Sequence, residues 1–168
     1  FKWAQINREG WDSEKANLIF ETLRLLIKQY YCNEIEIDDT VNISKGFAAI
    51  NAVLEFLKNA AEDSSIDKER LLKEIRKDLF AVHKKRVLLK WYLVLASNIS
   101  YKHDFYNAIN ILDSLNKKWS ILLPYILKIS FNITKESLNK IIGKYHEAVL
   151  QEEIFLNEIY LLYKKLEC

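Results

Sequence analysis

The stretch "VLLKWYLVLASNI", residues 87–99, decides the fold that the sequence predicts. Apolar residues stand on almost every side of a helix built from it, and Lys90 is the only charged residue in the run. A helix that is apolar all round is typical of the middle of a domain. We therefore expect residues 87–99 to form a central helix, with amphipathic helices wrapped around it.

The composition of the whole chain also favours helices. The 168 residues include only 3 Gly and 1 Pro, and half of them are hydrophobic. Gly and Pro are the residues that tight turns need most, so a fold rich in hairpin loops is excluded. A chain of this length buries one core. We predict a single all-α domain over residues 1–168, either an irregular helical bundle or a short helical-repeat array of five to six helices.

The spacing of apolar residues predicts where the helices begin and end. Residues 1–12 form a lead-in. The expected N-caps are Asp12 or Ser13, Ser44, Asp104 and Thr134. The expected helices then cover residues 13–31, 45–60, 66–99 and 105–118, a short segment that Pro124 opens or kinks, and a last helix from residue 135 onward. Residues 33–43 are acidic and alternate with apolar residues, which indicates a loop or, as an alternative, a short extended piece.

Charge is unevenly distributed although the formal net charge is only +2. Between residues 68 and 90, nine Lys or Arg stand against three acidic residues, which leaves +6 in one segment. We predict a basic patch there, formed by Arg76, Lys77, Lys84, Lys85 and Arg86. Such a patch could contact nucleic acid, or it could be a solvated face that complements the acidic residues 33–39.

Arg76 and His83 lie two helical turns apart, so both can point to the same side of a helix. An Arg that stabilises a phosphate and a His that moves a proton are the groups that RNA cleavage needs. Their spacing resembles the R-x(4–6)-H signature of the HEPN helical-bundle ribonucleases. That resemblance implies RNA cleavage at a dimeric site containing Arg76 and His83. The structural alternative is that both residues only solvate a basic helix face.

A second resemblance concerns residues 92–115. Small or apolar residues stand at Leu95, Ala96, Ile99, Phe105, Ala108, Leu112 and Leu115. This pattern resembles one hairpin of a tetratricopeptide repeat, and "GKYHEAVLQEE" after residue 142 resembles half of another, with Gly143 as its turn residue. The resemblance implies a surface that holds a partner protein or peptide without catalysis. We expect that surface beside Tyr101, His103, Phe105 and Tyr106.

Glu152 stands on the apolar stripe of the last helix, which predicts a buried carboxylate. A salt bridge to a neighbouring Lys, a rotated helix or a functional acid would each explain it. The sequence contains no Gly-rich phosphate loop, no G-x-S-x-G and no H-E-x-x-H. No zinc spacing occurs among its 2 Cys and 3 His. We therefore expect no cofactor and no metal.

Three N-x-[ST] triplets, at Asn42, Asn98 and Asn132, favour a secreted protein, and Cys32 could then be bridged to Cys168. The absence of Met, even at residue 1, favours a segment removed before Phe1. Two Cys are too few for a disulfide framework, and a cytoplasmic location is the slightly favoured expectation. The predicted function is a protein-interaction or adaptor module. The HEPN-like ribonuclease and a secreted helical-bundle ligand of the cytokine kind are the alternatives.

Overall fold

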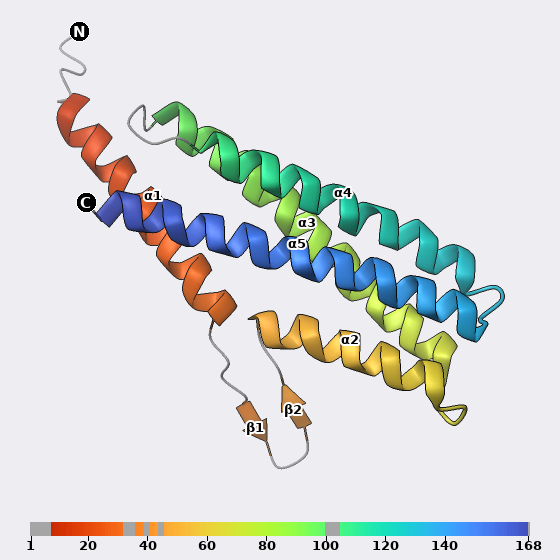
Figure 1. Ribbon diagram of the computed structural model, residues 1–168. Helices are drawn as coiled ribbons and strands as arrows, with labels where there is room; N and C mark the ends of the chain where they lie inside the picture. Colours follow the sequence, from red (N-terminus) through yellow and green to blue (C-terminus); the bar gives the residue numbers. More distant parts are fainter. Residues whose placement is uncertain (1–7, 32–35, 39–40, 44–45, 100–104, 168) are drawn as a thin grey trace, which may run out of the picture.

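The protein is an all-α helical bundle. The computed structural model describes residues 8–31, 36–38, 41–43, 46–99 and 105–167 (Figure 1). The described residues form five helices: α1 (Arg8–Tyr31), α2 (Gly46–Glu62), α3 (Lys68–Ile99), α4 (Tyr106–Ile129) and α5 (Lys135–Glu167). Two short strands, β1 (Glu36–Asp38) and β2 (Val41–Ile43), lie between α1 and α2.

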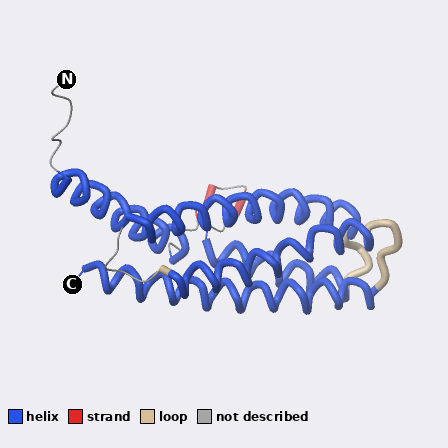
Figure 2. Tube along the Cα trace, turned by 90° about the horizontal axis from the view of Figure 1, so that it is seen from above, coloured by secondary structure: helices blue, strands red, loops and turns tan. Residues whose placement is uncertain are grey.

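The three helices α3, α4 and α5 form the body of the bundle. Helix α4 packs along both α3 and α5, and it runs antiparallel to each of them (Figures 1 and 2). As a result, α3 and α5 run in the same direction. Helix α2 packs against α5, and α1 lies mainly on α5 and to a smaller extent on α2 and α3. Helix α4 is therefore the element that holds the two longest helices together.

One continuous core joins all five helices, and the predicted apolar stripes face it. Large side chains such as Trp119, Phe155 and Leu112 are fully buried. The apolar residues whose helical spacing predicts these helices supply buried members of the core: Ile19 and Leu23; Leu54 and Leu57; Leu72, Ile75 and Leu79; Leu138, Tyr145, Val149 and Leu156. Tyr160, expected on the same stripe of the last helix, is exposed instead. The helical period of apolar residues thus located the inner face of each of these helices correctly.

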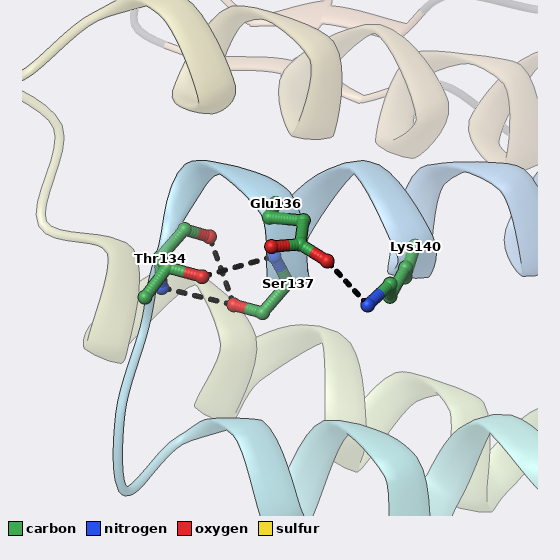
Figure 3. A network of polar contacts seen from close by, with 4 residues as sticks. All are labelled: Thr134, Glu136, Ser137 and Lys140. Carbon is green, nitrogen blue, oxygen red and sulfur yellow. Dashed lines mark hydrogen bonds and ion pairs between the residues drawn. The ribbon is translucent and has the colours of Figure 1, made fainter.

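The start of α5 confirms the cap predicted at Thr134. The Thr134 hydroxyl oxygen accepts a hydrogen bond from the backbone N–H of Ser137 at 3.1 Å, and the Thr134 N–H donates to the Ser137 hydroxyl at 2.9 Å (Figure 3). This reciprocal pair has the geometry of a capping box, with Ser in the place of the usual Glu or Gln. One turn later, Lys140 forms an ion pair with Glu136 at 2.6 Å. The bond from Ser137 to Thr134 satisfies one of the N–H groups that the first turn of a helix leaves unpaired.

Several predicted helix ends are wrong. Helix α1 begins at Arg8, before the expected caps, and α4 runs from Tyr106 to Ile129 without a break at Pro124. Pro124 lacks an N–H, so one backbone hydrogen bond of α4 is missing, but the burial of Leu122 and Ile126 on either side holds the helix together. The N-cap residue of α4 is Phe105, without a side-chain cap, and Asp104 lies outside the described residues, as does Ser44.

Part of the acidic segment forms the extended alternative rather than a loop. Strands β1 and β2 pair antiparallel, with Glu36 opposite Ile43 and Asp38 opposite Val41. Alternation of charged and apolar residues is the period of a strand, which explains this outcome. A ribbon of two three-residue strands adds little to the core that the helices form.

Residues 87–99 are not surrounded by other helices, which corrects the central expectation of the sequence. Within this run Leu93 and Ala96 are buried, whereas Val87, Leu88, Trp91 and Leu95 are exposed. The physical reason is the position of α3 at the edge of the bundle, where α4 is its main neighbour and α1 adds only a small contact. One long side of α3 therefore has no helix to cover it among the described residues.

Candidate protein-binding surface

The exposed side of α3 carries a straight row of large apolar side chains. Leu88, Trp91 and Leu95 are 61%, 65% and 60% exposed, and their spacing of three and four residues places them on one line along the helix. We call these three residues the α3 row. Lys84 precedes the row by one turn and Asn98 follows it, and both are exposed. Apolar residues at this spacing form the contact line of packed helices.

The opposite side of α3 explains why the row faces solvent. Arg86, two residues before Leu88, is buried and forms an ion pair with the fully buried Glu152 of α5. The indole N–H of Trp119 in α4 donates to the other Glu152 oxygen at 3.0 Å. Two residues correspond to about 200° around a helix, so the α3 row points almost directly away from this buried network.

Glu152 confirms the buried carboxylate that the sequence predicts, but its partner is Arg86 and not a Lys. Burial raises the pKa of Glu152, while the charge of Arg86 and the hydrogen bonds from Trp119 and Arg86 act in the opposite direction. An interior carboxylate of this kind needs its partners in place. We assign the network a structural role, because it joins α3, α4 and α5 at one level of the bundle.

A second exposed row lies on α5. Leu150, Ile154 and Leu161 are 47%, 51% and 53% exposed, and steps of four and seven residues keep them on one line. We call them the α5 row. Leu150 and Ile154 stand two residues on either side of Glu152, so this row also points away from the buried network. Glu147 and Glu153 beside the row are exposed.

The predicted basic patch is divided by the fold. Arg86 is buried in its pair with Glu152 and is therefore not part of a surface patch. Lys77 is exposed and forms an ion pair with Glu74 at 2.8 Å. Lys84 and Lys85 are exposed, and Arg76 is half-buried. Binding of nucleic acid through residues 68–90 stays a prediction, with fewer exposed cations than the sequence indicated.

Arg76 and His83 differ in their surroundings. Arg76 borders a groove of about 550 Å³ between α3 and α4, together with Lys77, Phe80, Leu123, Pro124 and Leu127. His83 does not line this groove; it is half-buried, and its Nδ1 is enclosed without a hydrogen-bond partner among the described residues. The groove therefore contains the phosphate-binding candidate of the ribonuclease hypothesis without its proton-transfer candidate. That hypothesis stays a prediction.

A smaller cavity of about 290 Å³ lies between α2 and α3, and its floor includes Trp119 and Tyr145. The two rings meet edge to face at 5.3 Å. The Tyr145 hydroxyl donates to the backbone oxygen of Ile50 at 3.2 Å, which ties α5 to α2. Burial, then the negative charges of Glu152 and Asp78, raise the pKa of Tyr145 well above its ordinary value. We therefore assign Tyr145 a structural role: its ring packs on Trp119 and its hydroxyl links α5 to α2.

The surface that the sequence proposed for a partner is only partly described. Tyr101 and His103 lie outside the described residues. Phe105 is buried in the core, so it cannot form part of an exposed binding face, whereas Tyr106 is exposed. The physical reason is that Phe105 closes the end of the α3–α4 hairpin, where a large ring fills space between the helices.

In the hairpin that resembles a tetratricopeptide repeat, Ala96 and Ala108 are both buried, and α3 and α4 pack on each other. The half-match is wrong in its turn, because Gly143 lies inside α5. Helix α3 alone has 32 residues, close to the 34 of a whole two-helix repeat. A relationship to that family stays a prediction.

The exposure of the α3 and α5 rows was not predicted from the sequence. The available signal was spacing: Lys84 and Asn98 continue the line of Leu88, Trp91 and Leu95 at steps of three and four, and a line with polar ends is typical of a solvent-facing side.

Of the three N-x-[ST] triplets, two have an Asn whose exposure the structure describes. Asn98 and Asn132 are exposed, while Cys32, Cys168 and the side chain of Asn42 lie outside what the structure describes. Among the described helices, none is both long and apolar enough for a membrane span. The described part of the chain also holds no cluster of His, Cys, Asp and Glu suited to a metal ion.

No family model, curated protein or solved structure matches this chain. The exposed apolar rows of the bundle are therefore the features that indicate a function.

Proposed function

We propose that this protein is a non-catalytic interaction module that binds protein chains through exposed apolar rows on its helices. The observation that carries the proposal is the α3 row. Three large apolar side chains, each more than half exposed, stand on one line of a rigid helix of 32 residues. Contiguous exposed apolar surface on a soluble domain marks an interaction site.

The shape of this surface favours a helical partner. A helix offers side chains at steps of three and four residues, which is also the spacing of Leu88, Trp91 and Leu95. Trp91 is the natural anchor, because Trp residues supply a large share of the binding energy at interfaces. Exposed Lys84 and Lys85 at one end of the row add a polar rim with positive charge.

The proposal is tested by capturing partners from the native source with tagged protein. We expect the triple variant Leu88→Ser/Trp91→Ser/Leu95→Ser to lose the proteins that the wild type retains, because the substitutions remove most of the apolar contact area. Leu18→Ser/Leu25→Ser on α1 is the matched control, since both residues are exposed and lie two turns apart. Circular dichroism on each variant checks that the helices stay folded.

The control variant should retain the same partners as the wild type. If the α3 variant retains all of them as well, with its helices intact, the α3 row is not the binding surface and the proposal is wrong.

A further inference from the structure

We infer that the chain assembles head to tail, with the α3 row of one copy packed on the α5 row of the next copy. This inference rests on the proposed function, because it names the occupant of the α3 row. The residues that the structure describes leave both rows exposed, and the charges beside one row are opposite to those beside the other.

Arg86 of α3 and Glu152 of α5 meet in the interior of the bundle, and each exposed row begins two residues away from one of them. Each row is therefore about 200° around its helix from the ion pair. The two rows consequently face opposite sides of the bundle. One chain cannot bring its own rows together, but two chains can.

The charges beside the two rows are complementary. Residues 79–99 of α3 contain no Asp or Glu, while Lys84 and Lys85 are exposed there. Residues 147–162 of α5 contain no Lys or Arg, while Glu147 and Glu153 are exposed and Glu158 is half-exposed. The apolar α3 row with its basic rim therefore matches the apolar α5 row with its acidic rim. Complementary charge of this kind favours the correct pairing and suppresses contacts between identical faces.

A parallel contact brings opposite charges together at one end of the two rows. Lys84 precedes Leu88 by four residues, and Glu147 precedes Leu150 by three. When the two helices lie parallel, Leu88 meets Leu150, Trp91 meets Ile154, and Lys84 comes opposite Glu147. Since α3 and α5 already run in the same direction within one chain, this contact keeps every copy in the same orientation.

A contact between two different faces is heterologous, so it forms a ring if the rotation closes and an open chain if it does not. The surface ion pair between Glu147 and Lys118, at 3.3 Å, does not prevent the contact, because an exposed pair of this kind contributes little.

The test uses two variants that each disable one face. Trp91→Glu places a negative charge in the α3 row, and Ile154→Lys places a positive charge in the α5 row. Wild-type protein should show a mass that rises with concentration up to about 100 μM in sedimentation and light scattering, a range in which micromolar contacts are populated. Each variant alone should stay at the 19.9 kDa of one chain.

Mixing the two variants gives the deciding result. Each variant retains the face that the other has lost, so an equimolar mixture should form a dimer of twice 19.9 kDa and nothing larger. Leu18→Glu on α1 is the control and should assemble like the wild type. Reversal of one charge, Lys84→Glu or Glu147→Lys, should weaken assembly at least several-fold, and the two reversals combined in one chain should restore it.

Three outcomes would overturn the inference. A wild type that stays monomeric at about 100 μM excludes this assembly. Assembly that is lost in Trp91→Glu but kept in Ile154→Lys means that two α3 rows face each other. A mixture that stays monomeric while the wild type assembles excludes pairing of α3 with α5. If the wild type is monomeric but the α3 row is still needed to capture partners, the proposed function stands and only its self-assembly fails.

Discussion

Arg86 shows how one buried residue sets the outer surface of this protein. Its side chain enters the interior between α3 and α5, where Glu152 and Trp119 surround the charge with partners. The direction of Arg86 fixes the rotation of α3, and with it the side on which Leu88, Trp91 and Leu95 stand. A polar residue inside the core thereby determines which apolar residues lie outside it.

The Arg86–Glu152 pair predicts a large effect of a single substitution. Arg86→Met should lower the free energy of unfolding by about 3–5 kcal/mol, because it leaves a buried carboxylate without its counter-charge. The double variant Arg86→Met/Glu152→Gln should recover most of the loss, since the Gln oxygen still accepts the Trp119 N–H. Urea unfolding followed by circular dichroism measures all three proteins.

Lys77→Met is the control for this experiment. Lys77 forms an exposed pair with Glu74, and surface pairs contribute only about 0–1 kcal/mol. A loss in Arg86→Met no larger than that of Lys77→Met would mean that the interior pair does not hold α3 and α5 together.

Tyr145 predicts a pH dependence at the alkaline end. Its pKa in the folded chain lies above the ordinary value of 10, so the unfolded chain loses this proton first. The stability that Tyr145 contributes is therefore complete below about pH 10 and is lost above it, by up to about 1.4 kcal/mol per pH unit. Tyr145→Phe should cost about 1 kcal/mol near pH 7, because the hydrogen bond to Ile50 is lost.

The difference between wild type and Tyr145→Phe should shrink and then reverse between about pH 7 and about pH 11 in urea unfolding measurements. A difference that stays constant across this range would show that the hydroxyl of Tyr145 titrates normally in the folded chain.

At the scale of the helices, local signals determined some ends and tertiary contacts determined others. Thr134 and Ser137 are close in sequence and cap α5 by themselves. Pro124 is a local signal for a helix break, yet α4 continues through it. The burial of Leu122, Ile126 and Ile129 against neighbouring helices outweighs the missing hydrogen bond. The start of α5 was thus predictable, because its cap is local. The continuation of α4 through Pro124 was not, because it depends on packing against other helices.

The cap of α5 gives a prediction at this scale. Thr134→Ala should lower the free energy of unfolding by about 0.5–2 kcal/mol, because the N–H of Ser137 loses its acceptor. Thr134→Ser keeps a hydroxyl in the same place and should be close to the wild type. Thermal unfolding compares the three proteins, and equal stability of Thr134→Ala and wild type would contradict a role for this cap.

At the scale of the whole molecule, the order of packing explains both exposed rows. Helix α4 packs against both α3 and α5, so each of these long helices buries the side that meets α4 and the interior. The smaller helices α1 and α2 add cover mainly to α5. Helix α3 therefore stands at an edge of the bundle, and the α5 row is the side of α5 that α4, α2 and α1 leave exposed. Packing of the α3 row of one copy on the α5 row of the next requires no change of fold.

The sequence by itself determined the fold class, the inner face of the amphipathic helices and the cap at Thr134, and it placed Glu152 on an apolar stripe. Each of these depends on residue type and on spacing within one helix, which the chain carries locally. Only the tertiary structure decided that Glu152 pairs with Arg86, that Phe105 is buried and that residues 87–99 stand at an edge. These outcomes depend on which helices become neighbours, and a helix that is apolar on all sides does not specify which of its sides a neighbour will cover.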